Sequence, residues 1–333
     1  MIKIHYYNSG SKTVQHDFNM MDFQLPIHNG DLLWVDLYAY SYNELNNIAD
    51  VFGFHPLAVE DCLHEGSRPK MDSYGDYKFF VLHAPIYNEK SNNEITTVEL
   101  NIFMGPNYIV TVHKQKLQWL GNMENVCINS PKYLEKGTDF LLHTIIDGIT
   151  DEYFPPVLER IRARIDELEE EIYDYQPKVV TEEFLALKRT IILIRQAIMP
   201  QRRIFSTTNG QWKFDIQEEN IPFYKDLNDH LERIVDSTET FRDLVNSTLD
   251  TYFSIISGKS IEKLNLLTVI STIMLPLSVI TSFFGMNVPL PYQDSPYTTI
   301  AISAFLVIFT WGGMWAYFKK MICLVCVSHT STN

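Results

Sequence analysis

The sequence has 333 residues, of which 46% are hydrophobic, so the chain is long enough for a substantial folded domain and apolar enough to build its core. Its formal net charge of −14 at pH 7 argues against nucleic acid as a partner, because phosphate-binding surfaces are rich in Lys and Arg. Four cysteines make no disulfide framework in a chain of this size, which indicates a reducing, cytosolic compartment for the folded part. Residues 1–10 lack the apolar run of a signal peptide.

Residues 1–135 predict an α/β domain. A helix is expected over 41–52, where Ser41 and Glu44 have the spacing of a capping box. Residues 105–107, Gly-Pro-Asn, have the composition of a tight turn between two strands. Four strand-like runs alternate with short helices: 31–39, 77–86, 98–103 and 108–113.

Residues 136–222 predict a helical layer. Its helices are expected over 139–173, with a distortion at Pro155 and Pro156, and over 181–198. Five acids crowd the six positions from 166 to 171, a pattern more typical of a solvated helix face than of a cation site.

A single stalk helix is predicted from residue 223 into the first of two late apolar stretches. No proline lies between Pro222 and Pro276, and apolar residues recur at helical spacing. From Phe223 to Leu275 such a helix would extend ~80 Å at ~1.5 Å per residue, long enough to transmit a motion as a lever. Pro276 predicts a local kink.

Two uncharged stretches, 264–284 and 298–318, have 21 residues each. Both are close to the ~20 residues that cross a ~30 Å hydrocarbon layer, so we predict two transmembrane helices. Residues 264–333 carry only Asp294, Lys319 and Lys320, a net of +1, which leaves −15 for residues 1–263. Lysines flank the two stretches and are absent from the 285–297 loop, which predicts a multi-pass protein with both termini, and the 319–333 tail, in the cytosol.

One face of the first span carries an ordered set of side chains that would line a pore. Around a symmetry axis its leucines would form a constriction that gates by dewetting, and its serines would offer oxygens to a hydrated cation. Serines that merely permit close helix packing are the alternative. Spacings of 3 and 4 residues place six positions on this face: Leu264, Leu267, Ser271, Leu275, Ser278 and Ser282.

The tripeptide Gly285, Met286 and Asn287 ends the first span, where a pore protein would place an ion-selecting ring. Two helices per chain cannot enclose a pore, so a ring-shaped oligomer is expected, with the second span against lipid. No nucleotide loop, zinc-protease motif, nucleophile elbow or dinucleotide fingerprint occurs, so we expect neither an enzyme nor an organic cofactor. We expect Cys323 and Cys326 to have no role beyond packing of the tail.

Gly285-Met286-Asn287, placed at the end of the first of two C-terminal spans, resembles the signature of the CorA family of magnesium transporters. Further stretches are similar to the same family, and together they cover nearly the whole chain. They are His-Pro-Leu-Ala-Val-Glu-Asp at 55–61 with Arg-Pro-Lys at 68–70, Tyr-Lys-Asp at 224–226 through His230, and Thr-Phe-Arg-Asp at 240–243 leading to Met-Leu-Pro-Leu at 274–277.

The resemblance implies a funnel-shaped homopentamer in the plasma (inner) membrane of a prokaryote that passes Mg²⁺, and also Co²⁺ or Ni²⁺, inward. A ring of Asn287 would select the hydrated ion, since Mg²⁺ gives up its water reluctantly. The narrow neck of the family would correspond to Leu264, Leu267 and Leu275, and its polar pore lining to Ser271, Ser278 and Ser282.

The resemblance also implies that cytosolic Mg²⁺ bound between subunits closes the pore. Asp226 matches the acid of the stalk helix in the family. The partner acid falls on Asn88, with Glu89 adjacent, so feedback would be weaker here or rebuilt around Glu89. Other departures are an outer loop with Asp294 as its one acid and a tail with only Lys319 and Lys320 as basic residues.

Two alternatives remain open. The zinc-transporting branch of the superfamily, typified by ZntB, usually carries Gly-Ile-Asn, so Met286 argues against it. A membrane-tethered cation sensor would use its spans only as anchors, and the aligned hydroxyls argue against that function.

Overall fold

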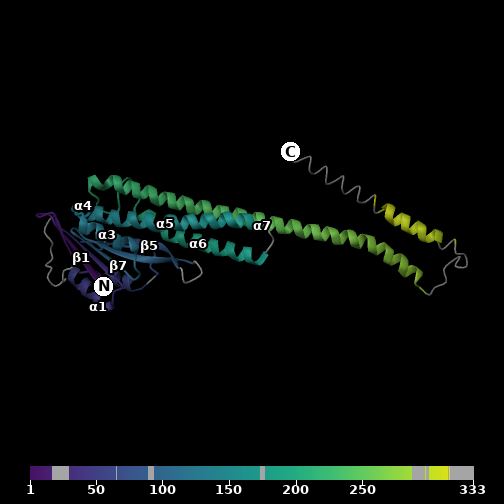
Figure 1. Ribbon diagram of the computed structural model, residues 1–333, viewed down its shortest axis with the longest axis horizontal. Coiled ribbons are helices and arrows are strands. Elements are labelled where there is room, and N and C mark those ends of the chain that lie inside the picture. The colour runs from purple at the N-terminus through teal and green to yellow at the C-terminus, as the bar shows by residue number, and fades with distance from the viewer. Residues whose placement is uncertain are drawn as a thin grey trace. The chain divides into compact units, whose positions relative to one another are not determined.

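The computed structural model describes residues 1–16, 30–64, 66–88, 94–172, 177–286, 297, 300–313 and 315 (Figure 1). The chain divides into two compact units, Met1–Asp250 and Thr251–Asn333. The helix α7, Ile221–Phe284, begins in the first unit and ends in the second.

A seven-stranded sheet forms the base of the first unit, in the order β2-β1-β3-β7-β6-β5-β4. All neighbouring pairs are antiparallel except β3 and β7, which pair in parallel at the centre. The strands are β1 Ile2–Asn8, β2 Thr13–His16, β3 Leu32–Tyr38, β4 Lys70–Ser73, β5 Lys78–Asn88, β6 Glu94–Met104 and β7 Tyr108–His113.

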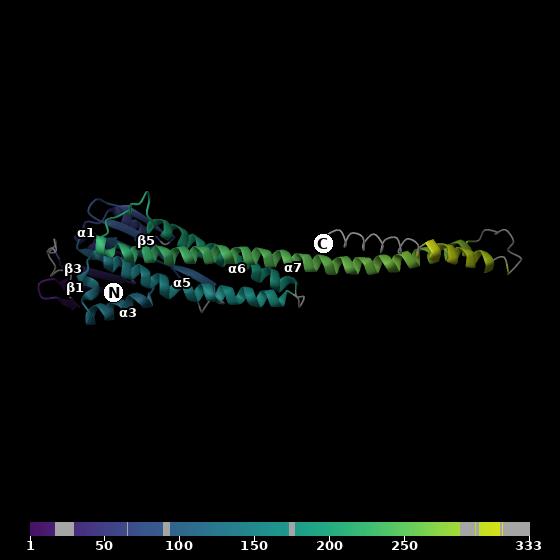
Figure 2. The same cartoon turned by 90° about the horizontal axis from the view of Figure 1, so that it is seen from above.

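Helices cover both faces of this sheet, so its central strands are apolar on both sides. The helices α1, Tyr42–Phe52, and α2, Pro56–Leu63, pack on one face. On the other face α5, Thr138–Glu171, and α6, Pro177–Ile204, lie against β5, with the first part of α7 beside them (Figure 2). The shorter α3, Gln118–Asn129, and α4, Lys132–Glu135, complete the unit.

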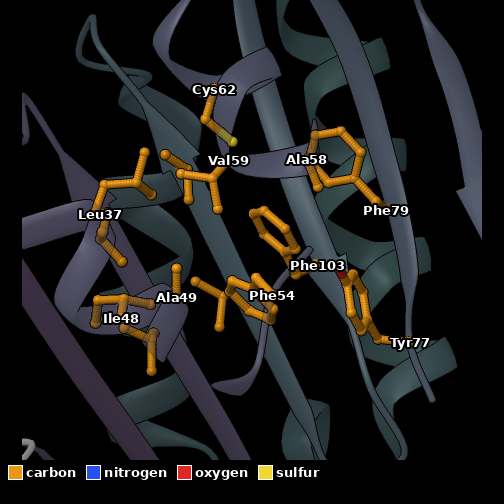
Figure 3. Packing of buried hydrophobic residues seen from close by; sticks show 14 of the residues in the cluster. Leu37, Ile48, Ala49, Phe54, Ala58, Val59, Cys62, Tyr77, Phe79 and Phe103 are labelled. Atoms are coloured by element: carbon orange, nitrogen blue, oxygen red, sulfur yellow. The ribbon is translucent and has the colours of Figure 1, made fainter. Parts of the chain in front are cut away.

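Aromatic stacking organises the core under α1 and α2. The ring of Phe54 lies 3.8 Å from that of Phe103 at an interplanar angle of 9°, and Tyr77 packs beside both (Figure 3). Phe103 is fully buried, as is Phe79, its direct partner on the adjacent strand β5. Successive residues of β5 point to opposite faces of the sheet. Phe79 packs in this core, whereas Phe80 contacts Phe205 of the loop that follows α6.

The predicted local elements of the α/β domain are confirmed. The 108–113 strand has the predicted bounds, and the predicted 31–39, 77–86 and 98–103 runs correspond to β3, β5 and a longer β6. Ser41 caps α1, and its side chain and that of Glu44 make the reciprocal bonds of a capping box. Residues 105–107 join β6 to β7, and a Cβ on Gly105 would lie 2.2 Å from the Tyr108 ring, which explains the glycine.

The long helices differ from the predictions mainly at their ends. α5 continues through Pro155 and Pro156 as one helix, and α6 begins before the predicted residue 181 and ends beyond residue 198. α7 contains Pro276 and runs through the predicted stalk and first span. Of the described helices, the one over Glu218–Ser282 is long and apolar enough to cross a membrane, whereas Ile300–Gly313, within the predicted second span, is apolar but shorter.

A buried ion pair joins the two parallel central strands. His113 Nε2 lies 3.1 Å from Asp36 Oδ1, and the other ring nitrogen contacts the carbonyl of Gln115. Thr111 donates its hydroxyl proton to the same carboxylate. Burial alone would lower the pKa of His113, but the hydrogen bond and charge of Asp36 prevail and raise it above its ordinary value.

This raised pKa predicts a pH dependence of stability. The ion pair stabilises the fold fully below the pKa of an unfolded histidine, and the contribution is lost as pH rises through the higher pKa of folded His113. The difference in Tm between the wild type and His113→Gln should therefore be several degrees larger at about pH 6 than at about pH 9. The exposed His64→Gln serves as the control, and a difference that grows with pH would contradict the assignment.

Candidate functional site

The six predicted pore-lining positions lie on one exposed face of α7. All of them are exposed within this chain, and Leu264, Leu267 and Leu275 each expose about three fifths of their surface (61%, 59% and 65%). The Ser278 hydroxyl donates to the Met274 carbonyl at 2.9 Å, which leaves the serine oxygen free to accept. We call this set, Leu264, Leu267, Ser271, Leu275, Ser278 and Ser282, the stripe.

The neighbouring helix, Ile300–Gly313, covers a different face of α7. A small cavity between the two helices is lined from α7 by Thr272, Ile273, Pro276, Leu277 and Ile280, and from the other side by Val307, Thr310 and Trp311. At about 100° per residue, these α7 positions are centred nearly opposite the stripe. The second unit therefore leaves the stripe uncovered while it packs its own two helices together.

The tripeptide follows the last turn of α7. Gly285 donates its backbone N–H to Thr281, which continues the helical bonding to that residue, and Met286 is 57% exposed. Asn287 lies outside the described residues, as do Glu89, Asp294 and the two tail cysteines.

Of the three predicted regulatory residues, Asp226 and Asn88 lie within the described part of the chain, whereas Glu89 does not. Asp226 lies in the first turns of α7 with 68% of its side chain exposed. Asn88 is the last residue of β5, where its backbone pairs with Glu94. The predicted combination of Asp226 with Asn88 or Glu89 stays a prediction.

Asp226 lies beside a group of ligand-type side chains that were not predicted from the sequence as ligands. His230, one turn later on α7, points its Nδ1 toward two carboxylates of α5, 3.5 Å from Asp147 Oδ1 and 3.3 Å from Asp151 Oδ1. Its Nε2 faces Asp226 Oδ1 at 3.7 Å. One ligand atom from each of His230, Asp147 and Asp151 lies within 4.8 Å of the others, a geometry that can hold a metal ion.

Burial and charge both act on this cluster. The pKa of Asp147 is raised, first by burial and then by the charge of Asp151. The ring of His143, one helical turn before Asp147, is buried, and its pKa is lowered by that burial despite the opposing effects of the Phe223 backbone and Asp226. The cluster thus places two carboxylates close to each other, the kind of setting in which a divalent cation relieves repulsion.

Comparison with known proteins identifies the family. Residues 29–320 match the family described as CorA-like Mg2+ transporter protein. The chain belongs to this family. Over 260 residues it is 32% identical to the cobalt/magnesium transport protein CorA of Thermotoga maritima, a match that covers 76% of this chain and 72% of that protein.

Solved structures of the CorA family and its neighbours share the fold. The complete CorA magnesium transporter of Methanocaldococcus jannaschii has a TM-score of 0.75 at 21% identity, over 93% of this chain and 96% of that one. The ZntB cytoplasmic domain from Vibrio parahaemolyticus has a TM-score of 0.58 at 14% identity, over 77% of this chain and 99% of that one. At these identities both comparisons establish the fold alone.

The exposed stripe yields a prediction about ion flux. Leu275→Ser replaces an exposed apolar side chain of the stripe with a hydroxyl, so it should ease wetting of the predicted constriction and raise divalent cation influx into liposomes severalfold. Leu277→Ser is the matched control, because Leu277 lies off the stripe at the contact with the second helix. Equal effects of the two substitutions would show that the stripe does not line the pathway.

Proposed function

We propose that the protein is a membrane channel-transporter of the CorA type that carries Mg²⁺, and also Co²⁺ or Ni²⁺, into the cell. The observation that carries this proposal is the stripe, which lies on the α7 face nearly opposite the helix–helix contact of the second unit. The family match supports the transported class, since the similar protein of T. maritima is named a cobalt/magnesium transport protein. Mg²⁺ and its substitutes are the cargo rather than a resident cofactor.

In this proposal the pore is shared by a ring of subunits, with five as the expected number. Each chain contributes the first span to the pore, and Asn287 closes the outer end as a ring of neutral oxygens that binds the ion through its water shell. The assigned segments are the cytosolic α/β domain 1–135, helical layer 136–222, stalk 223–263, spans 264–284 and 298–318, outer loop 285–297 and tail 319–333.

Transport would need no chemical energy source. A divalent cation that crosses a potential of about 100 mV, inside negative, gains about 2 × 2.3, or about 4.6 kcal/mol. The membrane would be the plasma membrane of a prokaryote, with both termini in the cytosol. The acidic cytosolic part would raise the local concentration of cations near the inner mouth.

Cytosolic Mg²⁺ would close this pore by binding between neighbouring subunits and stabilising the closed state by mass action. Asp226 is exposed on α7 and available for such contact. Its partner from the next subunit would be Glu89 or the amide of Asn88, a weaker ligand for Mg²⁺ than a carboxylate.

The central test is flux through purified protein in liposomes, with Mg²⁺ outside, a Mg²⁺ dye inside and an inside-negative potential. Asn287→Ala should reduce influx to background, because the ring of amide oxygens that binds the hydrated ion is removed. Asn265→Ala, which removes an amide from α7 at a position off the stripe, should leave influx intact.

Three outcomes would contradict the proposal. Normal flux through Asn287→Ala would remove the proposed filter. Passage of Zn²⁺ but not Mg²⁺ through the wild type would favour a zinc transporter. Impermeability to every divalent cation tested, with Co²⁺ and Ni²⁺ included, would favour a membrane-tethered cation sensor.

A further inference from the structure

A cavity of about 80 Å³, partly open to solvent, lies at the carboxyl ends of the two parallel strands β3 and β7. Tyr40, which follows β3, lines it together with Lys114 and Gln115, which follow β7. In sheets with parallel strands, ligands commonly bind at this edge. At ~10–15 Å³ for one water molecule, the cavity has room for a ligand of about five to eight non-hydrogen atoms.

Polar side chains replace the aromatic core at this end of the sheet. His83 lies four residues after Phe79 on β5, and Glu99 and Asn101 lie four and two residues before Phe103 on β6. Alternate residues of a strand share a face, so these three polar residues lie on the face that α1 and α2 cover. The cavity is therefore separate from the contact between α5 and α7, which lie on the other face.

The cavity wall offers hydrogen-bond acceptors that the described part of the chain leaves unfilled. Asn101 is only 3% exposed, and its Oδ1 has no hydrogen-bond partner among the described residues, whereas its amide N–H donates to Glu99. His83 Nε2 lies 2.8 Å from the carbonyl oxygen of Ser67. Since a carbonyl only accepts, Nε2 carries the proton and Nδ1 is left as an acceptor. A ligand with N–H donors would satisfy such acceptors, which are costly to bury alone.

Opposite charges border the same space. The side chain of Glu99 is only 11% exposed, and its burial raises its pKa despite hydrogen bonds from Asn101 and from the N–H of Gly66. Lys114 Nζ donates to the carbonyl of Leu63 at 2.9 Å, and its positive charge opposes that rise. A half-buried carboxylate favours a cationic group beside it, and an ammonium favours an anionic one. The cavity therefore suits a molecule that carries both charges.

Cys62 of α2 supplies an apolar part of the wall. Its side chain is buried, and this burial raises the pKa of the thiol well above its ordinary value. The thiol therefore stays protonated at neutral pH and behaves as a small hydrophobic group. A short aliphatic group of a ligand could pack against it.

We propose that this cavity binds a small zwitterion of the amino-acid type, with its ammonium group toward Glu99 and Asn101 and its carboxylate toward Lys114. The ammonium would donate N–H groups to the two oxygen acceptors, and its charge would compensate that of the buried carboxylate. Every residue that lines the cavity belongs to the α/β domain, so the binding does not depend on the proposed transport function.

The test is a titration of the purified full-length protein in detergent with L-alanine, followed by ligand-observed saturation-transfer NMR. Alanine has six non-hydrogen atoms, and its binding to the wild type should be saturable. Propionate lacks the ammonium group and ethylamine lacks the carboxylate. Each should bind about tenfold more weakly or less, because one set of charge-assisted hydrogen bonds is lost.

Two variants assign the ends of the ligand. Glu99→Gln should weaken alanine binding by about tenfold and bring it close to that of propionate. Lys114→Met should weaken the binding of alanine but leave that of ethylamine unchanged. Asp50→Asn and Lys116→Met remove the same charges from exposed positions of the domain and should leave the titrations unchanged. If Glu99→Gln lowers the Tm of the ligand-free protein, Lys114→Met, at a partly exposed residue, remains as the second variant.

Three results would overturn the proposal. The first is the absence of saturable alanine binding by the wild type, which would leave water as the occupant of the cavity. The second is equal binding of alanine, propionate and ethylamine. The third is retention of the wild-type alanine titration by both Glu99→Gln and Lys114→Met, or an equal loss in the two exposed control variants.

Discussion

The periodicity of the α-helix is the constraint on which the candidate functional surfaces of this protein depend. Residues three and four positions apart share a face of the helix, and the side chains between them point to other faces. The same rule aligns the stripe, from Leu264 to Ser282, and assigns Pro276 and Ile280 to the contact with the neighbouring helix. It also brings Asp147 and Asp151 together opposite His230. One long helix thereby carries chemically distinct surfaces without a change in its backbone.

The acidic residues show that the position of a carboxylate in the fold matters more for a candidate cation site than the number of acids in a stretch of sequence. The densest acidic run, from Asp166 to Glu171, is exposed and partly paired within the helices, with Arg164 Nη1 2.6 Å from Glu167. This confirms the predicted solvated face. The ligand atoms that converge belong instead to two aspartates in an otherwise ordinary segment of α5. A carboxylate becomes a candidate ligand when a side chain of a second helix, here His230 of α7, packs close to it.

Local signals in the sequence predicted much of the fold. The capping box at Ser41 and the alternating apolar pattern of 108–113 depend on neighbours in the chain, and both are confirmed. The absence of proline predicted the continuity of α7 up to Pro276. The strands β1, β2 and β4 were not predicted, because Ile2–Asn8 mixes polar and apolar residues and because Thr13–His16 and Lys70–Ser73 are short and polar. The stripe was visible in the sequence, whereas the meeting of Asp147 with His230 depends on tertiary packing between α5 and α7.

The hydroxyl of Ser278 illustrates a final consequence of helical bonding. Its proton is directed to the backbone carbonyl of Met274, so the side chain presents only oxygen lone pairs outward. An anion requires a donor in order to exchange its hydration shell for protein contacts, and this position offers it none. The waters around a cation, by contrast, direct their hydrogens outward and can donate to that oxygen. In the proposed pore, a neutral serine can in this way discriminate by the sign of an ion's charge without placing a formal charge in the membrane.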